Sequence, residues 1–403
     1  MIKKQLLESY TPLYFLAALG AGGVAVTFFI FLMFLVPHPD SPMVTFDDLW
    51  PILTDGHPVA GALIGLAMAG MLFFTALHVR LLTWNLFELR HFVVTEAYTR
   101  LRNSNGEATL MTLPLTLAMS INVLFVNAAV FIPGLWRIVE YLFPFAILGF
   151  LAVGALALRI YTRYFARVIG NGGFDFDDNN NLGQMVAVFA FAMIAVGLAA
   201  PGAMSHHAGI NAIGMFGSMF FTAIAVSMGL LKLVMGFKSM LTQGIAPAAA
   251  PSLWIAIPIL TLLGIALIRL RFGLWHGFGE QVSTPGLFTL TSTILSLQLV
   301  FGILGYAVMR RIDYFATYLR GDQRHPGSYA LICPGVALFV FGMFFVHLGL
   351  VRNGLIAQFS PTYFALLLPL LVLQMKTLTT LLRLNARLLA APLRPLVEVT
   401  TRV

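Results

Sequence analysis

The chain has 403 residues, of which 59% are hydrophobic and 10% are charged, and its formal net charge is +8. Soluble domains carry about 25% charged residues, so this composition excludes a soluble protein and indicates a polytopic membrane protein. The single cysteine, Cys333, excludes an intrachain disulfide framework and a cysteine-based metal cluster.

Hydropathy along the chain predicts ten membrane-spanning helices, because a helix needs about 20 apolar residues to cross a bilayer. The predicted spans are 12–36, 57–82, 109–133, 138–160, 182–203, 208–233, 249–269, 286–309, 328–350 and 361–382. We expect them to form a single all-α domain over residues 1–403, surrounded by lipid. The first apolar run extends to about Val36, which is too long for the apolar segment of a cleavable signal peptide.

Basic residues determine the predicted orientation. With the N-terminus inside, 20 of the 24 lysines and arginines and ten of the 16 acidic residues lie on the cytoplasmic side. The positive-inside rule then places both termini in the cytoplasm. The net charge is therefore largely a signal of topology, and we expect no nucleic-acid partner. We expect a multi-pass protein of the cell inner (plasma) membrane.

The ends of the even-numbered spans indicate a repeat. Each of these spans runs toward the cytoplasm and ends in basic residues, the first of which are Arg80, Arg159, Lys232, Arg310 and Arg383. These residues recur at intervals of 73 to 79 residues. The even spacing predicts five helical hairpins of similar length.

Glycine and proline residues concentrate in the odd-numbered spans. Proline bends a helix, and such a break is tolerated in a membrane where protein or a water-filled cavity surrounds it. We therefore predict an inner ring of five kinked odd helices around a central pore and an outer ring of five straighter even helices. The residues expected to line this pore are Gly20, Gly23, Pro114, Asn122, Gly197, Pro258, Pro334 and Gly335.

Charged side chains are expected near the ends of the spans. Arg80, Lys232, Arg269 and Lys376 lie toward span ends, where long basic side chains extend to the interface, and no carboxylate falls near a bilayer centre. Ionisable residues at the midplane are costly and usually functional. Their scarcity here argues against a proton pump and favours a passive pathway.

Histidines are candidate haem ligands, since a membrane cytochrome holds haem between histidines on facing helices. His78 lies near the inner end of its span and His347 near the outer end of its own, so the two are not at matching depths. The spans carry no catalytic triad and no nucleotide-binding motif. We expect neither a metal, nor another cofactor, nor an enzymatic activity.

Four short stretches resemble a known family. The segment Glu88–Val93 is similar to the Glu-x-Arg-His-Pro-Val segment of the tellurite-resistance/dicarboxylate transporter family, which includes the plant slow anion channels. Three further stretches resemble the family's third, seventh and ninth spans: Thr112-Leu113-Pro114, Ser252-Leu253 with Ile257-Pro258, and Gly335-Val336-Ala337.

The resemblance implies a homotrimer in which each protomer has its own pore. Family members pass monovalent anions or carry sulfite, malate or related acids, and a phenylalanine on the ninth span closes the pore. Here Pro334 stands at that position, Phe92 replaces the loop proline, and 97–108 resembles an insertion. Phe341 lies seven residues beyond Pro334, on about the same helix face, and is our candidate for the replacement gate.

The leading hypothesis is therefore a channel or transporter for small anions such as chloride, nitrate, sulfite or similar oxyanions. The first alternative is a gated carrier for dicarboxylate or tellurite-type oxyanions. The others are a membrane redox subunit and a family scaffold that serves cation transport or sensing.

Overall fold

The computed structural model describes residues 2–56, 58–172, 174–176 and 179–390, and these residues form helices and no β-strand. Ten of the helices in this part of the chain are long and apolar enough to cross a membrane, which confirms the predicted all-α, ten-span organisation. The helices are α1 Phe15–Leu35, α2 Phe46–Asp55, α3 Pro58–Phe92, α4 Glu96–Arg102, α5 Thr112–Phe131, α6 Val139–Asn171, α7 Val186–Met204, α8 Ala208–Gln243, α9 Ala256–Phe278, α10 Thr284–Arg311, α11 Ile332–Phe344 and α12 Pro361–Leu384.

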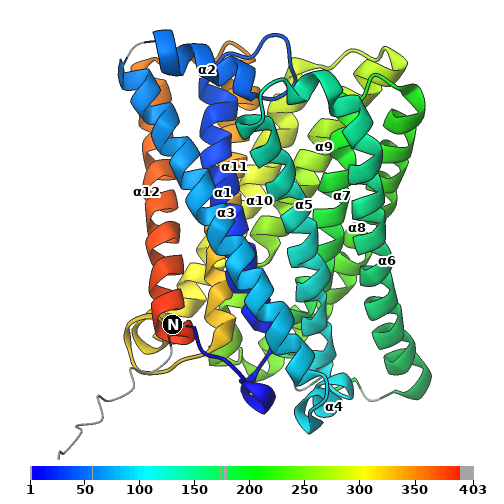
Figure 1. Cartoon of the computed structure of the whole chain (residues 1–403). Coiled ribbons are helices and arrows are strands. Elements are labelled where there is room, and N and C mark those ends of the chain that lie inside the picture. Colours follow the sequence, from blue (N-terminus) through cyan, green and yellow to red (C-terminus); the bar gives the residue numbers. More distant parts are fainter. Residues whose placement is uncertain (1, 57, 173, 177–178, 391–403) are drawn as a thin grey trace, which may run out of the picture.

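Figure 1 shows the long helices standing side by side, with the N-terminal segment and α4 at one end of the bundle and α2 at the other. We refer to these as the α4 end and the α2 end. The ten spanning helices are α1, α3 and α5 to α12, and the short helices α2 and α4 lie in the connections between them.

Burial separates the odd-numbered spans from the even-numbered ones. In the most apolar window of α1, α5, α7, α9 and α11, between 50% and 94% of the residues are buried. In α3, α6, α8, α10 and α12 the share is between 22% and 28%. The even-numbered spans therefore present most of their apolar surface outward, as helices in contact with lipid do.

Contacts between the spans follow the same division. Each odd-numbered span contacts the even-numbered span that follows it, as α1 with α3 and α7 with α8. The five buried helices also contact one another in the sequence α1, α5, α7, α9, α11 and back to α1.

A short 3₁₀ helix precedes each of the five buried helices at the α4 end. These segments are η2 Pro12–Tyr14, η3 Asn105–Met111, η5 Gly183–Met185, η6 Pro247–Trp254 and η8 Pro326–Leu331. Pro114, Pro258 and Pro334 occupy the third positions of α5, α9 and α11. Proline is tolerated in the first turn of an α-helix, because its missing N–H is not needed there. These prolines therefore stand where a 3₁₀ turn changes to α-helix.

Several helices extend past the predicted span ends. α3, α6, α8 and α9 end nine to eleven residues beyond the predicted boundaries, at Phe92, Asn171, Gln243 and Phe278. Each of these predicted ends lies within two residues of a basic residue, but lysine and arginine are good helix formers and continue a helix. Arg269 consequently lies within α9 and not at its end.

Close packing of α7 against α6 generates a stability prediction. A Cβ atom on Gly197 would lie 2.2 Å from the buried ring of Phe150, whereas a Cβ on Gly65 of α3 would have no neighbour within 4 Å. We expect Gly197→Ala to destabilise the protein by about 1–3 kcal/mol through overpacking. Gly65→Ala, the matched control, should leave stability unchanged or slightly higher. Thermal unfolding of the purified variants in detergent measures both, and equal melting temperatures would contradict this packing.

Candidate functional site

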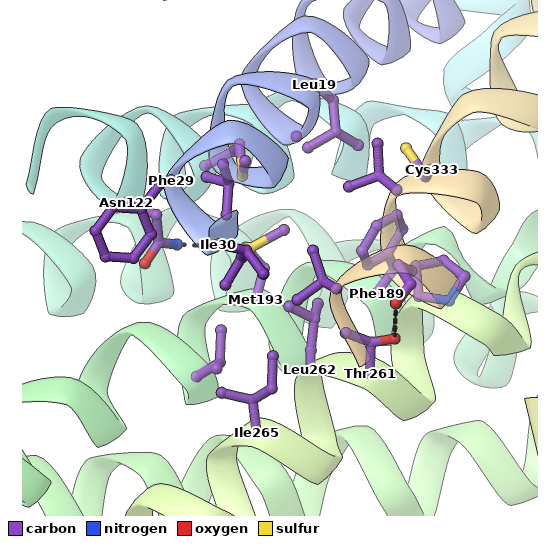
Figure 2. A pocket seen from close by; sticks show the side chains of 18 of the residues that line it. Leu19, Phe29, Ile30, Asn122, Phe189, Met193, Thr261, Leu262, Ile265 and Cys333 are labelled. Atoms are coloured by element: carbon purple, nitrogen blue, oxygen red, sulfur yellow. Dashed lines mark hydrogen bonds between the residues drawn. The ribbon is translucent and has the colours of Figure 1, made fainter. Parts of the chain in front are cut away.

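A central cavity of about 140 Å³ lies among the five buried helices, each of which contributes to its lining (Figure 2). Five of the residues predicted to line a pore line this cavity or a second, adjacent cavity that is described below. Gly20, Gly23 and Asn122 line the central cavity, Pro258 lines both, and Pro334 lines the second one. Most of the remaining lining of the central cavity is aliphatic or aromatic.

A second cavity, of about 360 Å³, lies at the α4 end, where the 3₁₀ segments form much of its wall. Its lining is more polar than that of the central cavity. The polar side chains are the amides of Asn105, Asn179, Asn180, Asn181 and Gln184, together with Thr109, Ser252 and His325.

Three residues line both cavities: Phe189 of α7, Pro258 of α9 and Cys333 of α11. They therefore mark the junction where the two cavities meet. Phe189 carries the largest side chain of the three, and Figure 2 shows it near Thr261 and Cys333. Sequence reasoning missed Phe189, because α7 is apolar on every side and its pattern does not show which face points inward.

Arg269 is the charged side chain of the central cavity. It follows Pro258 by 11 residues, a helical rise of about 16 Å, and so lies at the end of the cavity away from the junction. Its Nη1 donates a hydrogen bond to the carbonyl of Val196 at 2.8 Å. The prediction that Arg269 lies toward a helix end is wrong, because α9 continues nine residues beyond it.

The predicted gate, Phe341, lines neither cavity. Its fully buried ring lies against Gly264, whose Cβ position is 2.5 Å from that ring. Gly197 and Gly335 also face neighbouring helices, Gly197 toward Phe150 and Gly335 toward Thr377. Pro114 is buried in the first turn of α5 and is likewise absent from both linings.

Lys232 lies beside the second cavity and is 4% exposed, so the prediction that it extends to the interface is wrong. Its Nζ lies 5.2–5.6 Å from the ring centroids of Tyr164, Phe165 and Phe174. It also donates to Oε1 of Gln184 at 3.4 Å. These rings and the amide stabilise a cation that has no carboxylate partner among the ion pairs of the described residues.

His78 and His347, the two candidate haem ligands, connect neighbouring helices. His78 contacts the carbonyl of Ala18 through Nδ1 and the hydroxyl of Ser120 through Nε2, both at 2.8 Å. His347 contacts the carbonyl of Met343 at 2.8 Å and the hydroxyl of Tyr363 at 2.9 Å. Among the residues that the structure describes, no group of three or more His, Cys, Asp or Glu is placed to hold a metal ion.

Comparison of the chain with protein-family models, with curated proteins and with solved structures gives no match. The resemblance to the tellurite-resistance/dicarboxylate transporter family therefore stays a prediction.

His325, in the wall of the second cavity, gives a prediction for pH dependence. Burial lowers the pKa of its imidazole, and its Nδ1 accepts a hydrogen bond from the backbone N–H of Gly327 at 3.1 Å. The stability that it contributes is present above its unfolded pKa of about 6.5 and is lost as the pH falls through the lower folded value. The melting temperature of the wild-type protein should therefore fall further between pH 7.5 and pH 5 than that of His325→Asn.

Asparagine keeps an acceptor for the Gly327 N–H but does not titrate in this range, so the difference between the two proteins isolates His325. Equal losses of melting temperature would show that its protonation is not linked to folding.

Proposed function

We propose that the protein conducts small anions across a membrane through a pathway within each protomer. The observation that carries the proposal is the arrangement of two adjacent cavities, one of them lined by all five buried helices, that meet at Phe189, Pro258 and Cys333. The pathway would run from the second cavity, past this junction, to Arg269. The contacts among the five buried helices support an inner ring. The exposure of the even-numbered spans, which are α3, α6, α8, α10 and α12, supports an outer ring.

Charge supports an anion as the permeant species. Among the described residues, neither cavity has an acidic lining residue. Arg269 provides a positive charge at one end of the pathway, and Lys232 lies behind Gln184 near the other. Side-chain amides of the second cavity, which include N–H donors, can replace part of the hydration shell of an entering anion.

Phe189 is the residue that we propose to close the pathway. Its aromatic ring stands at the junction with a rigid proline on α9 and a small cysteine on α11. An apolar constriction of this kind gates by excluding water. Phe189 thus takes the role that the sequence assigned to Phe341.

The assembly and the membrane belong to the same proposal. The family resemblance supports a homotrimer in an inner membrane, and the distribution of lysine and arginine supports an orientation with both termini cytoplasmic. In this orientation the α4 end, with its amide-lined cavity, faces the cytoplasm.

Ion flux into proteoliposomes tests the proposal directly. Purified protein is reconstituted, and chloride, nitrate and potassium gradients are compared. We expect chloride or nitrate flux and no potassium flux. Flux that saturates far below channel rates would favour the carrier alternative, whereas potassium flux, or the absence of anion flux in both the wild-type protein and Phe189→Ala, would contradict the proposal.

Substitution at the junction tests the gate. Phe189→Ala removes the ring between the cavities and should raise anion flux about tenfold or more, because opening a hydrophobic constriction lets water and ions enter. Phe341→Ala is the matched control, since it removes an equally buried ring that lines neither cavity. Flux is measured per folded protein, because each truncation also costs about 3–5 kcal/mol of stability. A rise in flux with Phe341→Ala but not with Phe189→Ala would show that the gate is Phe341 on the ninth span.

A further inference from the structure

Arg269 has a positive charge that the described protein does not balance. The ion pairs in the described part of the chain involve Arg100, Arg102 and Arg167, and none includes Arg269. A guanidinium carries five N–H donors, and the hydrogen bond of Nη1 to the Val196 carbonyl uses one of them. Arg269 is partly buried, and because a charge withdrawn from water without a partner is costly, this side chain is suited to receive an anion.

The other polar side chains of the central cavity are already engaged. The hydroxyl of Thr261 donates to the Ala337 carbonyl at 3.0 Å and accepts from Gln298 at 2.6 Å. The amide nitrogen of Asn122 donates to the Ala118 carbonyl at 3.1 Å and contacts the sulfur of Met193 at 3.6 Å. The spare hydrogen-bond donors of this cavity therefore belong to Arg269.

The rest of the cavity suits an apolar group. Its wall includes Val26, Ile30, Val196, Leu262 and Ile265. Its volume of about 140 Å³ is close to that of an engineered apolar cavity of about 150 Å³ that binds benzene. A small inorganic anion bound at Arg269 would leave most of this apolar space unfilled.

We propose that the central cavity binds a monocarboxylate whose apolar part is about the size of a benzene ring. The carboxylate pairs with the guanidinium of Arg269 at the end of the cavity away from the junction. The apolar part extends among the aliphatic side chains toward Phe189. The inference rests on the proposed function, because it names the substrate class of the same site.

Equilibrium binding to purified wild-type protein in detergent provides the test, with radiolabelled benzoate as the probe and benzamide as its uncharged analogue of equal size. We expect saturable binding of one benzoate per protomer and at least about tenfold weaker binding of benzamide, because a hydrogen bond to a charged group is lost. Equal affinities, or no saturable benzoate binding, would overturn the inference.

Variants locate the ligand. Arg269→Gln should weaken benzoate binding about tenfold or more and leave benzamide binding unchanged. Arg271→Gln is the matched control, since Arg271 lies two residues further along α9, donates to the Gly286 carbonyl and lines neither cavity. If Arg269→Gln fails to fold, Arg269→Lys keeps the charge and should keep the preference for benzoate over benzamide. Unchanged benzoate affinity in folded Arg269→Gln would overturn the proposed pairing.

The flux assay separates this inference from the proposed function. Chloride or nitrate flux without benzoate binding would refute the amphipathic ligand and leave the anion pathway standing. Benzoate binding that depends on Arg269, without flux of any anion, would support the binding site and refute the pathway.

Discussion

Satisfaction of backbone hydrogen bonds inside a membrane is the constraint on which this structure depends. A spanning segment in lipid must pair its own N–H and C=O groups, so the chain crosses as ten helices. Five 3₁₀ segments precede the buried helices at the α4 end, and at its other end the ninth span closes in a π-helical stretch, Phe345–Val351. Pro114, Pro258 and Pro334 stand at the change from 3₁₀ to α-helix, where a missing N–H costs little. The second cavity is built from these same segments.

The central cavity combines two environments that seldom occur together. Its wall is mostly apolar, so water inside it has few partners, yet Arg269 introduces a full charge at one end. The strength of an electrostatic interaction rises as the dielectric constant falls, so this guanidinium attracts an anion more strongly than one at the surface. The five buried helices thereby enclose a cavity and place a positive charge in its wall, which is the basis of the proposed function.

Hydropathy predicted the ten spans correctly, because twenty apolar residues in succession leave few other structures possible. The helix ends were not predictable from the first basic residue, and Arg269 was misplaced for that reason. The rotation of each helix about its own axis was the second feature that the sequence did not predict. A helix that is apolar all round gives no signal of its inward face, so Phe341 was preferred and Phe189 was missed. Gly20 and Gly23 were found because glycine and proline concentrate in the odd-numbered spans, and Asn122 because an amide is exceptional in an apolar helix.

The central claim, that ions pass the junction between the two cavities, is tested most directly at Cys333, the single cysteine of the chain. A small negatively charged thiol reagent, sulfonatoethyl methanethiosulfonate, is applied to proteoliposomes while anion flux is recorded, and mass spectrometry measures the extent of modification. The account predicts that modification of Cys333 blocks flux and that Cys333→Ala protein is insensitive to the reagent. Complete modification with unchanged flux would place the pathway elsewhere and contradict the account.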